Sequence, residues 1–380
     1  MAQRSDLLPH IVREPRTLAD LVQLTGASLP TLRRILAELE ADRIVTVVGR
    51  DASRGGRPAQ RFGLDPSGAV VLGVHLVHPG MRVVAATLTG EVLEEYVPDI
   101  GALDPGDVTT EVARYADAVR ARHAPRPVFG IGVATPGFVD PISGQILSIG
   151  RAPTWSHVPL TERLASATGM RVTVHNDMDA LASSDVSGQE AVASLVYVGY
   201  GEGLKFSLMI DGTPYAGPFG NAGLAPDALF ARLGRADDAA LWRVPGLVAA
   251  FDGADVVEAQ PRHATRARFD EILAAYAQAD PSVTPIVDRM IEVLGAETAA
   301  VVHLLQPATL IFGGALAGAP DAVLAGLERT VRASLPTLLD HALHVRPARV
   351  VGPRSTALGA TRAFLARYFA DATPLPTVVS

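Results

Sequence analysis

Apolar residues at helical spacing predict three short helices at the start of the chain. Residues 4–13 form the first, and the second begins with a capping box of Thr17 and Asp20 and stops at Gly26. In the third, four apolar residues fall at positions i, i+3, i+4 and i+7 and form one buried stripe: Leu32, Ile35, Leu36 and Leu39. This is the pattern of a small helical domain with a glycine turn before its last helix.

The third helix carries polar and basic residues outside its apolar stripe. Ser28 caps the helix. At about 100° per residue, Arg34 lies opposite the stripe, while Thr31 and Arg33 flank it. A helix, a glycine turn and an arginine-bearing helix form the arrangement that places a recognition helix in the major groove of DNA. We therefore expect these four residues to face DNA.

A hairpin with a basic tip follows the three helices. Residues 44–48 read as a strand and residues 61–64 as its return, and Arg54 and Arg57 bracket two glycines between them. A lean basic loop suits the narrow minor groove, where negative potential attracts arginine. A solvated hairpin tip on a small helical domain is the alternative. The helix pair and the hairpin, which would form a wing, together favour a winged helix-turn-helix over residues 1–64. These residues are called the head below.

From residue 69 onward, strand-like and helix-like patterns alternate. Strands are expected within 69–77, 81–95, 128–140 and 171–177, and a second set runs from 194 to 318; helices are expected at 106–122, 159–168, 283–305 and 323–334. The alternation predicts layered α/β lobes that bind ligands at strand carboxyl ends or between lobes. We expect a first lobe over 65–185 and a second over 186–370, with a C-terminal helix that returns to the first and a flexible tail at 371–380.

Charge and composition narrow the classes of function. The head holds ten arginines against seven acidic residues, a balance of +3 within a total of −7, which leaves −10 for residues 65–380. A basic head on an acidic body suggests that only the head meets a polyanion. The absence of cysteine excludes disulfides, thiol catalysis and cysteine-ligated zinc. No secretory signal and no membrane span are visible in the pattern, so a cytoplasmic protein is expected.

Five segments run in a fixed order along the chain: GRPAQRFGLDPSGAVVLGV, GIGVATPGFVD, APTWSHVPLTERLASATGMRVTVHNDMDALA, LVYVGYGEGLKFSLMIDGTPYAGPFGNAG and HLLQPATLIFGGALAG. Together they resemble the transcriptional-regulator branch of the ROK family (repressor, open reading frame, kinase). The resemblance implies an α/β protein in which a winged helix-turn-helix precedes two ribonuclease-H-like lobes of the actin-like ATPase and sugar kinase type.

The chain departs from the phosphate motifs that the family's kinases use for ATP. The first family motif is Asp-x-Gly-Gly-Thr, and residues 75–79 read HLVHP, without the acid or the glycines. In the second motif Glu202 replaces a threonine, and two like charges at about 4 Å cost on the order of 4 kcal/mol. Lys205 would offset part of that repulsion, and the family's adenosine-side pair Gly313-Gly314 is retained. We expect no ATP binding.

The ligand and zinc sets implied by the resemblance are only partly present. Gly137, Asn176 and Asp177 match the sugar-contacting positions, whereas Leu224 and Asp227 replace the family's Glu and His. A leucine facing a sugar hydroxyl leaves that group unpaired, which costs about 1–3 kcal/mol. A more apolar or modified ligand, or none, is therefore expected. Without the zinc histidine or any cysteine, we expect neither metal nor cofactor.

The pair Asn176-Asp177 follows a run of β-branched residues and has three interpretations. Asp177 would act as a catalytic base at a strand end, the pair would contact a ligand, or it would cap the next helix. Because the phosphate motifs are replaced, Asp177 is expected to be a vestigial base, with no catalytic residue and no enzymatic activity. Trp155 aligns with a family tryptophan and is expected to pack inside the lobe, with ligand stacking as the alternative.

Three functions follow from these observations. The favoured one is a DNA-binding regulator, a repressor, whose body senses a sugar-like molecule. It would act as a homodimer or homotetramer on a near-palindromic double-stranded operator. The second is a sugar kinase that also binds DNA and uses Asp177 as base. The third is a regulator that binds no small ligand.

Overall fold

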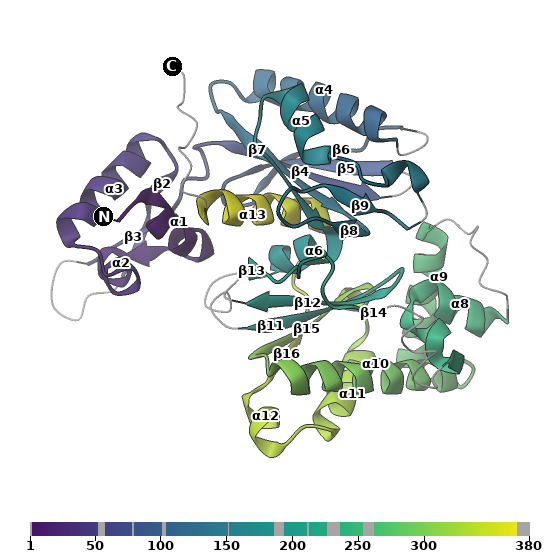
Figure 1. The fold of residues 1–380 in the computed structure, drawn as a ribbon. Coiled ribbons are helices and arrows are strands. Elements are labelled where there is room, and N and C mark those ends of the chain that lie inside the picture. The colour runs from purple at the N-terminus through teal and green to yellow at the C-terminus, as the bar shows by residue number, and fades with distance from the viewer. Residues whose placement is uncertain are drawn as a thin grey trace. The chain divides into compact units, whose positions relative to one another are not determined.

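The computed structural model describes residues 2–51, 58–77, 80–100, 104–150, 152–185, 194–210, 213–225, 236–253 and 262–370 (Figure 1). The expected tail at 371–380 lies outside the described residues, as do Arg54, Arg57, His78, Pro79 and Asp227. The chain divides into two compact units. The first comprises Met1–Ala191, Ala216–Asn221 and Gly352–Ser380, and the second comprises Val192–Tyr215 and Ala222–Val351. Within the described part, no helix is long and apolar enough to cross a membrane.

The head folds as its apolar pattern predicts. Its elements are α1 (Arg4–Arg13), β1 (Arg16–Thr17), α2 (Leu18–Thr25), α3 (Leu29–Ala41), β2 (Val45–Arg50) and β3 (Gln60–Leu64). The capping box of Thr17 and Asp20 is present, and Gly26 ends α2 in the left-handed region at φ 66°. All four residues of the predicted stripe on α3 are buried. The sequence analysis missed β1, which pairs antiparallel with β3 at the edge of the sheet β1-β3-β2.

The first lobe is built on a five-stranded sheet, here called the first sheet, in the order β10-β7-β4-β5-β6. Its elements are β4 (Val70–Val77), β5 (Gly80–Thr87), β6 (Val92–Tyr96), α4 (Pro105–His123), β7 (Val128–Thr135), β8 (Phe138–Val139), β9 (Ile146–Ser148), η1 (Pro153–Trp155), α5 (Leu160–Thr168), β10 (Val172–Asn176), α6 (Asp177–Asp185) and α13 (Ser355–Ala370). Strands β4, β7 and β10 are parallel. The segment predicted at 81–95 is two strands, because a turn around Gly90 (φ 88°) separates β5 from β6.

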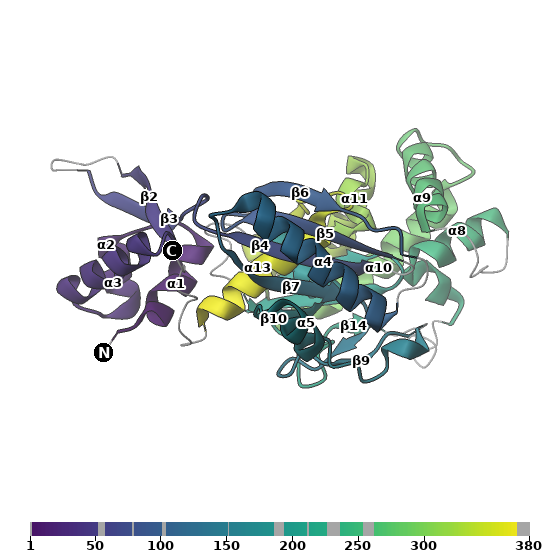
Figure 2. The same cartoon turned by 90° about the horizontal axis from the view of Figure 1, so that it is seen from above.

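The two faces of the first sheet are covered by different helices (Figures 1 and 2). Helices α4 and α5 pack on one face, against every second residue of β4, β7 and β10. Trp155 is completely buried in this layer, which confirms the packing role expected for it. Helices α6 and α13 cover the other face, where Ala134, Ala180 and Ala360 meet.

The second unit repeats the strand order of the first sheet. Its elements are β11 (Leu195–Tyr200), β12 (Leu204–Ile210), β13 (Thr213–Pro214), β14 (Leu224–Ala225), η3 (Ala236–Trp242), α8 (Val244–Asp252), α9 (Arg262–Ala277), α10 (Thr284–Leu305), β15 (Thr309–Gly314), η4 (Ala315–Gly318), α11 (Asp321–Ala333), α12 (Thr337–Ala342) and β16 (His344–Pro347). Its order is β13-β12-β11-β15-β16, with β11, β15 and β16 parallel. The predicted twofold α/β pattern is confirmed.

Candidate functional site

The exposed face of α3 is the first candidate surface, and its two arginines differ in their surroundings. Both Arg33 and Arg34 are exposed. Arg34 forms an ion pair with Glu38 one turn further along α3. Arg4 of α1 reaches the same carboxylate at 3.5 Å. Arg33 forms no ion pair with any described residue, so its guanidinium is available to a partner.

The remaining predicted contacts of α3 serve its first turn. The Ser28 hydroxyl accepts a hydrogen bond from the Thr31 backbone N–H at 3.5 Å, and the two side-chain oxygens lie 2.9 Å apart. This is helix capping, which satisfies one of the donors left open at a helix start. A contact with DNA remains a prediction for Ser28 and Thr31. Arg33 follows this first turn, and a contact of Arg33 with DNA likewise remains a prediction.

Three other described arginines of the head, Arg4, Arg16 and Arg61, form ion pairs within it. Arg61 donates to Asp51 at 2.8 Å and to the Pro15 carbonyl at 2.7 Å, which fastens the wing to the chain before β1. Arg16 pairs with Glu14 at 2.6 Å. Arg50 at the end of β2 is exposed and forms no ion pair with the described residues. The sequence analysis did not single out Arg50, because it predicted a strand over 44–48, whereas β2 continues to Arg50.

The second candidate surface is the edge where β4, β7 and β10 end, called the carboxyl edge below. Asn176 closes β10 opposite Thr135 at the end of β7. The Asn176 amide donates to the Gly137 carbonyl at 3.1 Å, so the structure brings these two predicted ligand residues together. Gly137 has φ 88°, and a Cβ there would lie 2.1 Å from the Ser148 carbonyl oxygen. Only glycine fits this turn.

Asn176 and Asp177 also cap α6. The Asn176 carbonyl oxygen of the side chain accepts from the Met178 backbone N–H at 3.0 Å, and an Asp177 carboxylate oxygen accepts from the same group at 2.8 Å. The structure therefore supports the capping interpretation of this pair. The side-chain amide of Asn176 donates to Gly137, and its side-chain oxygen accepts the capping hydrogen bond. Ligand binding by Asn176 and by Asp177 therefore stays a prediction.

His175 precedes this pair and carries a testable electrostatic signature. Burial, with a smaller contribution from the positive charge of Arg367, lowers the pKa of His175 from 6.5 to about 4. Its Nε2 lies 2.9 Å from the Thr173 hydroxyl. The imidazole is therefore neutral in the folded protein near neutral pH.

We expect the His175→Gln variant to lose less stability on acidification than the native protein. Between pH 6.5 and about 4, the unfolded native chain binds a proton at His175 that the folded chain excludes. The free energy of unfolding of the native protein then falls as the pH falls through this window, by at most about 1.4 kcal/mol per pH unit. Urea unfolding of both proteins at several pH values measures the difference. A constant difference would contradict the assignment.

The positions aligned with the second phosphate motif and with the adenosine-side glycines lie in the second unit. Glu202 is exposed in the turn between β11 and β12. Lys205 is only 3% exposed and alternates along β12 with the core residues Leu204 and Phe206, so it occupies the opposite face of that sheet. A Cβ at Gly313 would lie 2.0 Å from the Tyr197 hydroxyl, and this hydroxyl accepts from the Gly314 N–H at 3.2 Å. The glycine pair is thus required by packing.

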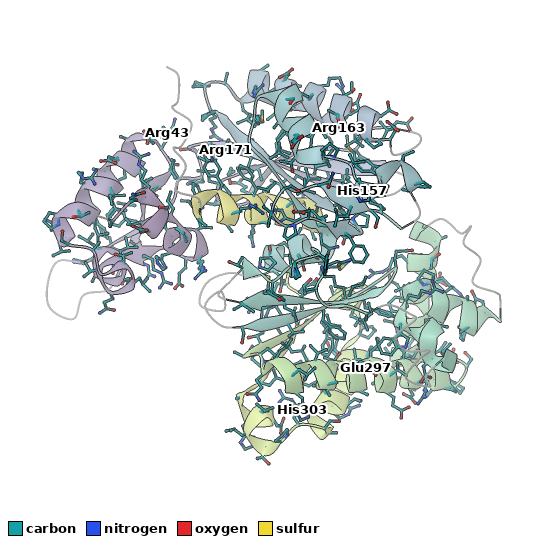
Figure 3. The ribbon with its side chains drawn as sticks, in the orientation of Figure 1. Arg43, His157, Arg163, Arg171, Glu297 and His303 are labelled. Carbon is teal, nitrogen blue, oxygen red and sulfur yellow. The ribbon has the colours of Figure 1, made fainter. Side chains whose placement is uncertain are left out.

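The described residues contain no group of three or more His, Cys, Asp or Glu side chains placed to hold a metal ion. His303, labelled in Figure 3, donates from Nε2 to the Ser334 carbonyl at 2.7 Å. This bond ties the end of α10 to the end of α11. Leu224, which stands where the family has a glutamate, is 39% exposed on β14.

Part of the chain matches a known protein family. Residues 112–225 match the model of the ROK family. The xylose repressor of Caldicellulosiruptor bescii is 26% identical over 217 residues, which are 54% of this chain and 52% of that protein. This chain therefore spans about half the length of that relative.

The solved structures with the same fold include a regulator and a kinase. A ROK family transcriptional regulator, homologous to the Escherichia coli Mlc protein, superposes with a TM-score of 0.74 at 20% identity, over 97% of each chain. The ROK hexokinase of Thermus thermophilus gives a TM-score of 0.59 at 22% identity, over 77% of this chain and 97% of the hexokinase. The chain carries a ROK family domain within residues 112–225, on the fold shared by ROK regulators and ROK sugar kinases.

Proposed function

We propose that this chain is a DNA-binding transcriptional regulator, a repressor, whose kinase-like body senses a small sugar-like molecule. The observation that carries the proposal is the head. It consists of two helices joined by a glycine turn and a β-hairpin wing, and the guanidinium of Arg33 lies on the exposed face of α3 without an ion pair to the described residues. The structure of the ROK regulator superposes over 97% of this chain, whereas the hexokinase superposes over 77% of it.

The proposed operator is a near-palindrome in double-stranded DNA. One winged helix reads one half-site, so two heads from two copies of the chain are needed for a full site. Footprinting of genomic DNA with the purified protein at physiological salt tests the proposal. We expect protected sites with two similar half-sites, and an affinity that falls steeply with salt. Uniform, sequence-independent protection would argue against a regulator.

A sugar kinase is the competing function, because the fold is shared with a hexokinase and Asp177 stands at the end of β10. The exposed carboxylate of Glu202 in the β11–β12 turn and the buried position of Lys205 favour a body without phosphoryl transfer. We expect no ATP-dependent phosphorylation of any sugar in a panel. Phosphorylation that disappears in the Asp177→Asn variant would establish the kinase instead.

The effector would bind at the carboxyl edge, beside Gly137 and Asn176. A regulator without any small ligand is the alternative, since the amide of Asn176 is already bonded to Gly137. Thermal-shift measurements against sugars, sugar phosphates and aromatic glycosides separate the two. A ligand that raises the melting temperature of the native protein but not of Asp177→Ala supports sensing at this edge.

A further inference from the structure

The C-terminal helix α13 lies on the first sheet with almost no space between their backbones. A Cβ added at Gly73 of β4 would lie 2.0 Å from the Ala357 carbonyl oxygen. A Cβ added at Gly132 of β7 would lie at the same distance from the Ala360 carbonyl oxygen. Glycines on two neighbouring strands therefore let the first half of α13 rest directly on the sheet. This contact leaves no freedom for α13 to slide without moving the strands.

The same half of α13 packs against α6, the helix that Asn176 and Asp177 begin. A Cβ at Gly359 would lie 1.8 Å from the Ala180 carbonyl oxygen, and the Arg362 guanidinium donates to the Ser184 carbonyl. Because both contacts advance in the same direction along the two helices, α6 and α13 run parallel. Their N-termini therefore lie at the carboxyl edge, beside the proposed ligand residues.

The second half of α13 is part of the hydrophobic core of the head. One cluster joins the end of α13 to α1 and to β7: Leu7, Leu8, Ile11, Phe129, Phe364, Leu365, Tyr368 and Phe369. The rings of Phe129 and Tyr368 meet edge to face at 4.8 Å, and the Arg171 guanidinium stacks over Tyr368 at 4.8 Å. Arg171 and Arg43 mark this junction in Figure 3.

The covalent connection between the head and the first lobe is equally close. The Asp65 N–H donates to the Ile44 carbonyl at 2.9 Å, and Arg43 donates to the Ser67 hydroxyl at 2.9 Å. A Cβ at Gly68 would lie 1.6 Å from the Arg43 carbonyl oxygen. The head is therefore attached to the first lobe by a folded turn and by α13, rather than by an extended linker.

We propose that α13 is the element that couples the carboxyl edge of the first sheet to the head, with Tyr368 and Phe369 as positioning residues for DNA binding. A ligand that moves the start of α6 must move α13, because Gly359 and Ala180 are in backbone contact. A helix of 16 residues spans about 24 Å, so α13 is long enough to carry a displacement of its first half to its last turns. These last turns pack against α1 in the hydrophobic core of the head. Coupling of this kind is reciprocal in binding free energy.

The decisive variant is Gly359→Ala in the full-length protein. Its methyl group forces α13 away from α6 at the end remote from the head. We expect faster amide hydrogen exchange in α1, and operator affinity changed by about 5- to 150-fold. The matched control is Gly295→Ala, whose Cβ would lie 2.6 Å from the Thr330 side chain between α10 and α11, in the second unit. The control is expected to leave exchange in α1 unchanged.

Two outcomes overturn the proposal. One is exchange that rises in α6 of Gly359→Ala while α1 stays as in the native protein. The other is exchange in α1 that rises equally in the Gly295→Ala control, which would indicate a general loss of stability. The exchange measurement needs no DNA, so it tests the coupling even where the native protein binds no operator and the proposed function fails.

The Phe369→Leu variant tests the same coupling from the head end and covers the case in which Gly359→Ala does not fold. Phe369 is 1% exposed, and the shorter leucine keeps the site apolar. Reciprocity predicts faster amide exchange at the start of α6, around Asp177, far along the helix from the substitution. Unchanged exchange there, with faster exchange in α1, would show that the head moves independently of the carboxyl edge and would overturn the proposal.

Discussion

Replacing Arg33 with alanine is expected to weaken operator binding by roughly 5- to 150-fold, which is the range for loss of one good base contact. Arg33 is exposed on α3 and forms no ion pair with the described residues, so in the proposed complex it would contact DNA without first breaking an ion pair within the protein. Arg34→Ala is expected to have a smaller effect, because Arg34 is already paired with Glu38. Breaking that pair to reach DNA would cancel part of the gain.

Titration of labelled operator by fluorescence anisotropy measures both variants against the native protein. The comparison is made at several salt concentrations and with one operator base pair changed at a time. Arg33→Ala is expected to relax specificity at one position, whereas Arg50→Ala, at the wing, is expected to weaken all sequences alike and to reduce the salt slope by about one. A larger loss for Arg34→Ala than for Arg33→Ala would contradict the assignment of the contact face.

Elements whose determinants lie within one turn of each other were predicted correctly. The capping box at the start of α2, the left-handed Gly26 and the buried stripe of α3 are all set by residues three or four positions apart. The strand β1 was missed because it has two residues and exists only through its pairing with β3, more than forty positions further along the chain. The pattern of residues 16–17 alone therefore does not indicate a strand.

The difference between Arg33 and Arg34 could be read only in part from the sequence. Both flank or oppose the apolar stripe, and both were assigned to DNA. Glu38 is a helical neighbour of Arg34, but its additional contact with Arg4 depends on how α1 packs against α3. For the pair Asn176-Asp177, the capping interpretation needed only local sequence, whereas the bond from Asn176 to Gly137 requires β7 and β10 to be neighbours.

The least predictable feature is the core that the head shares with the C-terminal helix. Phe364 and Leu8 lie at opposite ends of the chain and yet belong to one cluster. No periodicity in either segment specifies the other as its partner. The glycines that admit α13 to the sheet, Gly130 among them, looked like ordinary residues of a buried strand. The resemblance to a two-lobed fold indicated that the C-terminal helix returns to the first lobe. It did not indicate that this helix also packs into the core of the head.

The largest effect on stability is expected for Phe364→Ala, which should lower the free energy of unfolding of the first unit by about 3–5 kcal/mol. Phe364 is completely buried. Its ring packs so closely against β7 that a Cβ added at Gly130 would lie 2.1 Å from a ring carbon. The cavity left by the ring is walled by the backbone of β7, which cannot move in to fill it. Because the same cluster contains Leu7, Leu8 and Ile11, α1 should lose protection in the same transition.

The chain provides its own probes for this experiment, since its only two tryptophans, Trp155 and Trp242, are buried in the first and second units respectively. Urea unfolding followed by fluorescence in a Trp242→Phe background reports on the first unit, and in a Trp155→Phe background on the second. Phe364→Ala should shift the Trp155 transition, and the control Leu327→Ala, completely buried in α11, should shift the Trp242 transition. Exchange in α1 that stays at the native level while the Trp155 transition shifts would mean that the head folds on its own. The shared core would then be a contact between separate domains rather than one cooperative structure.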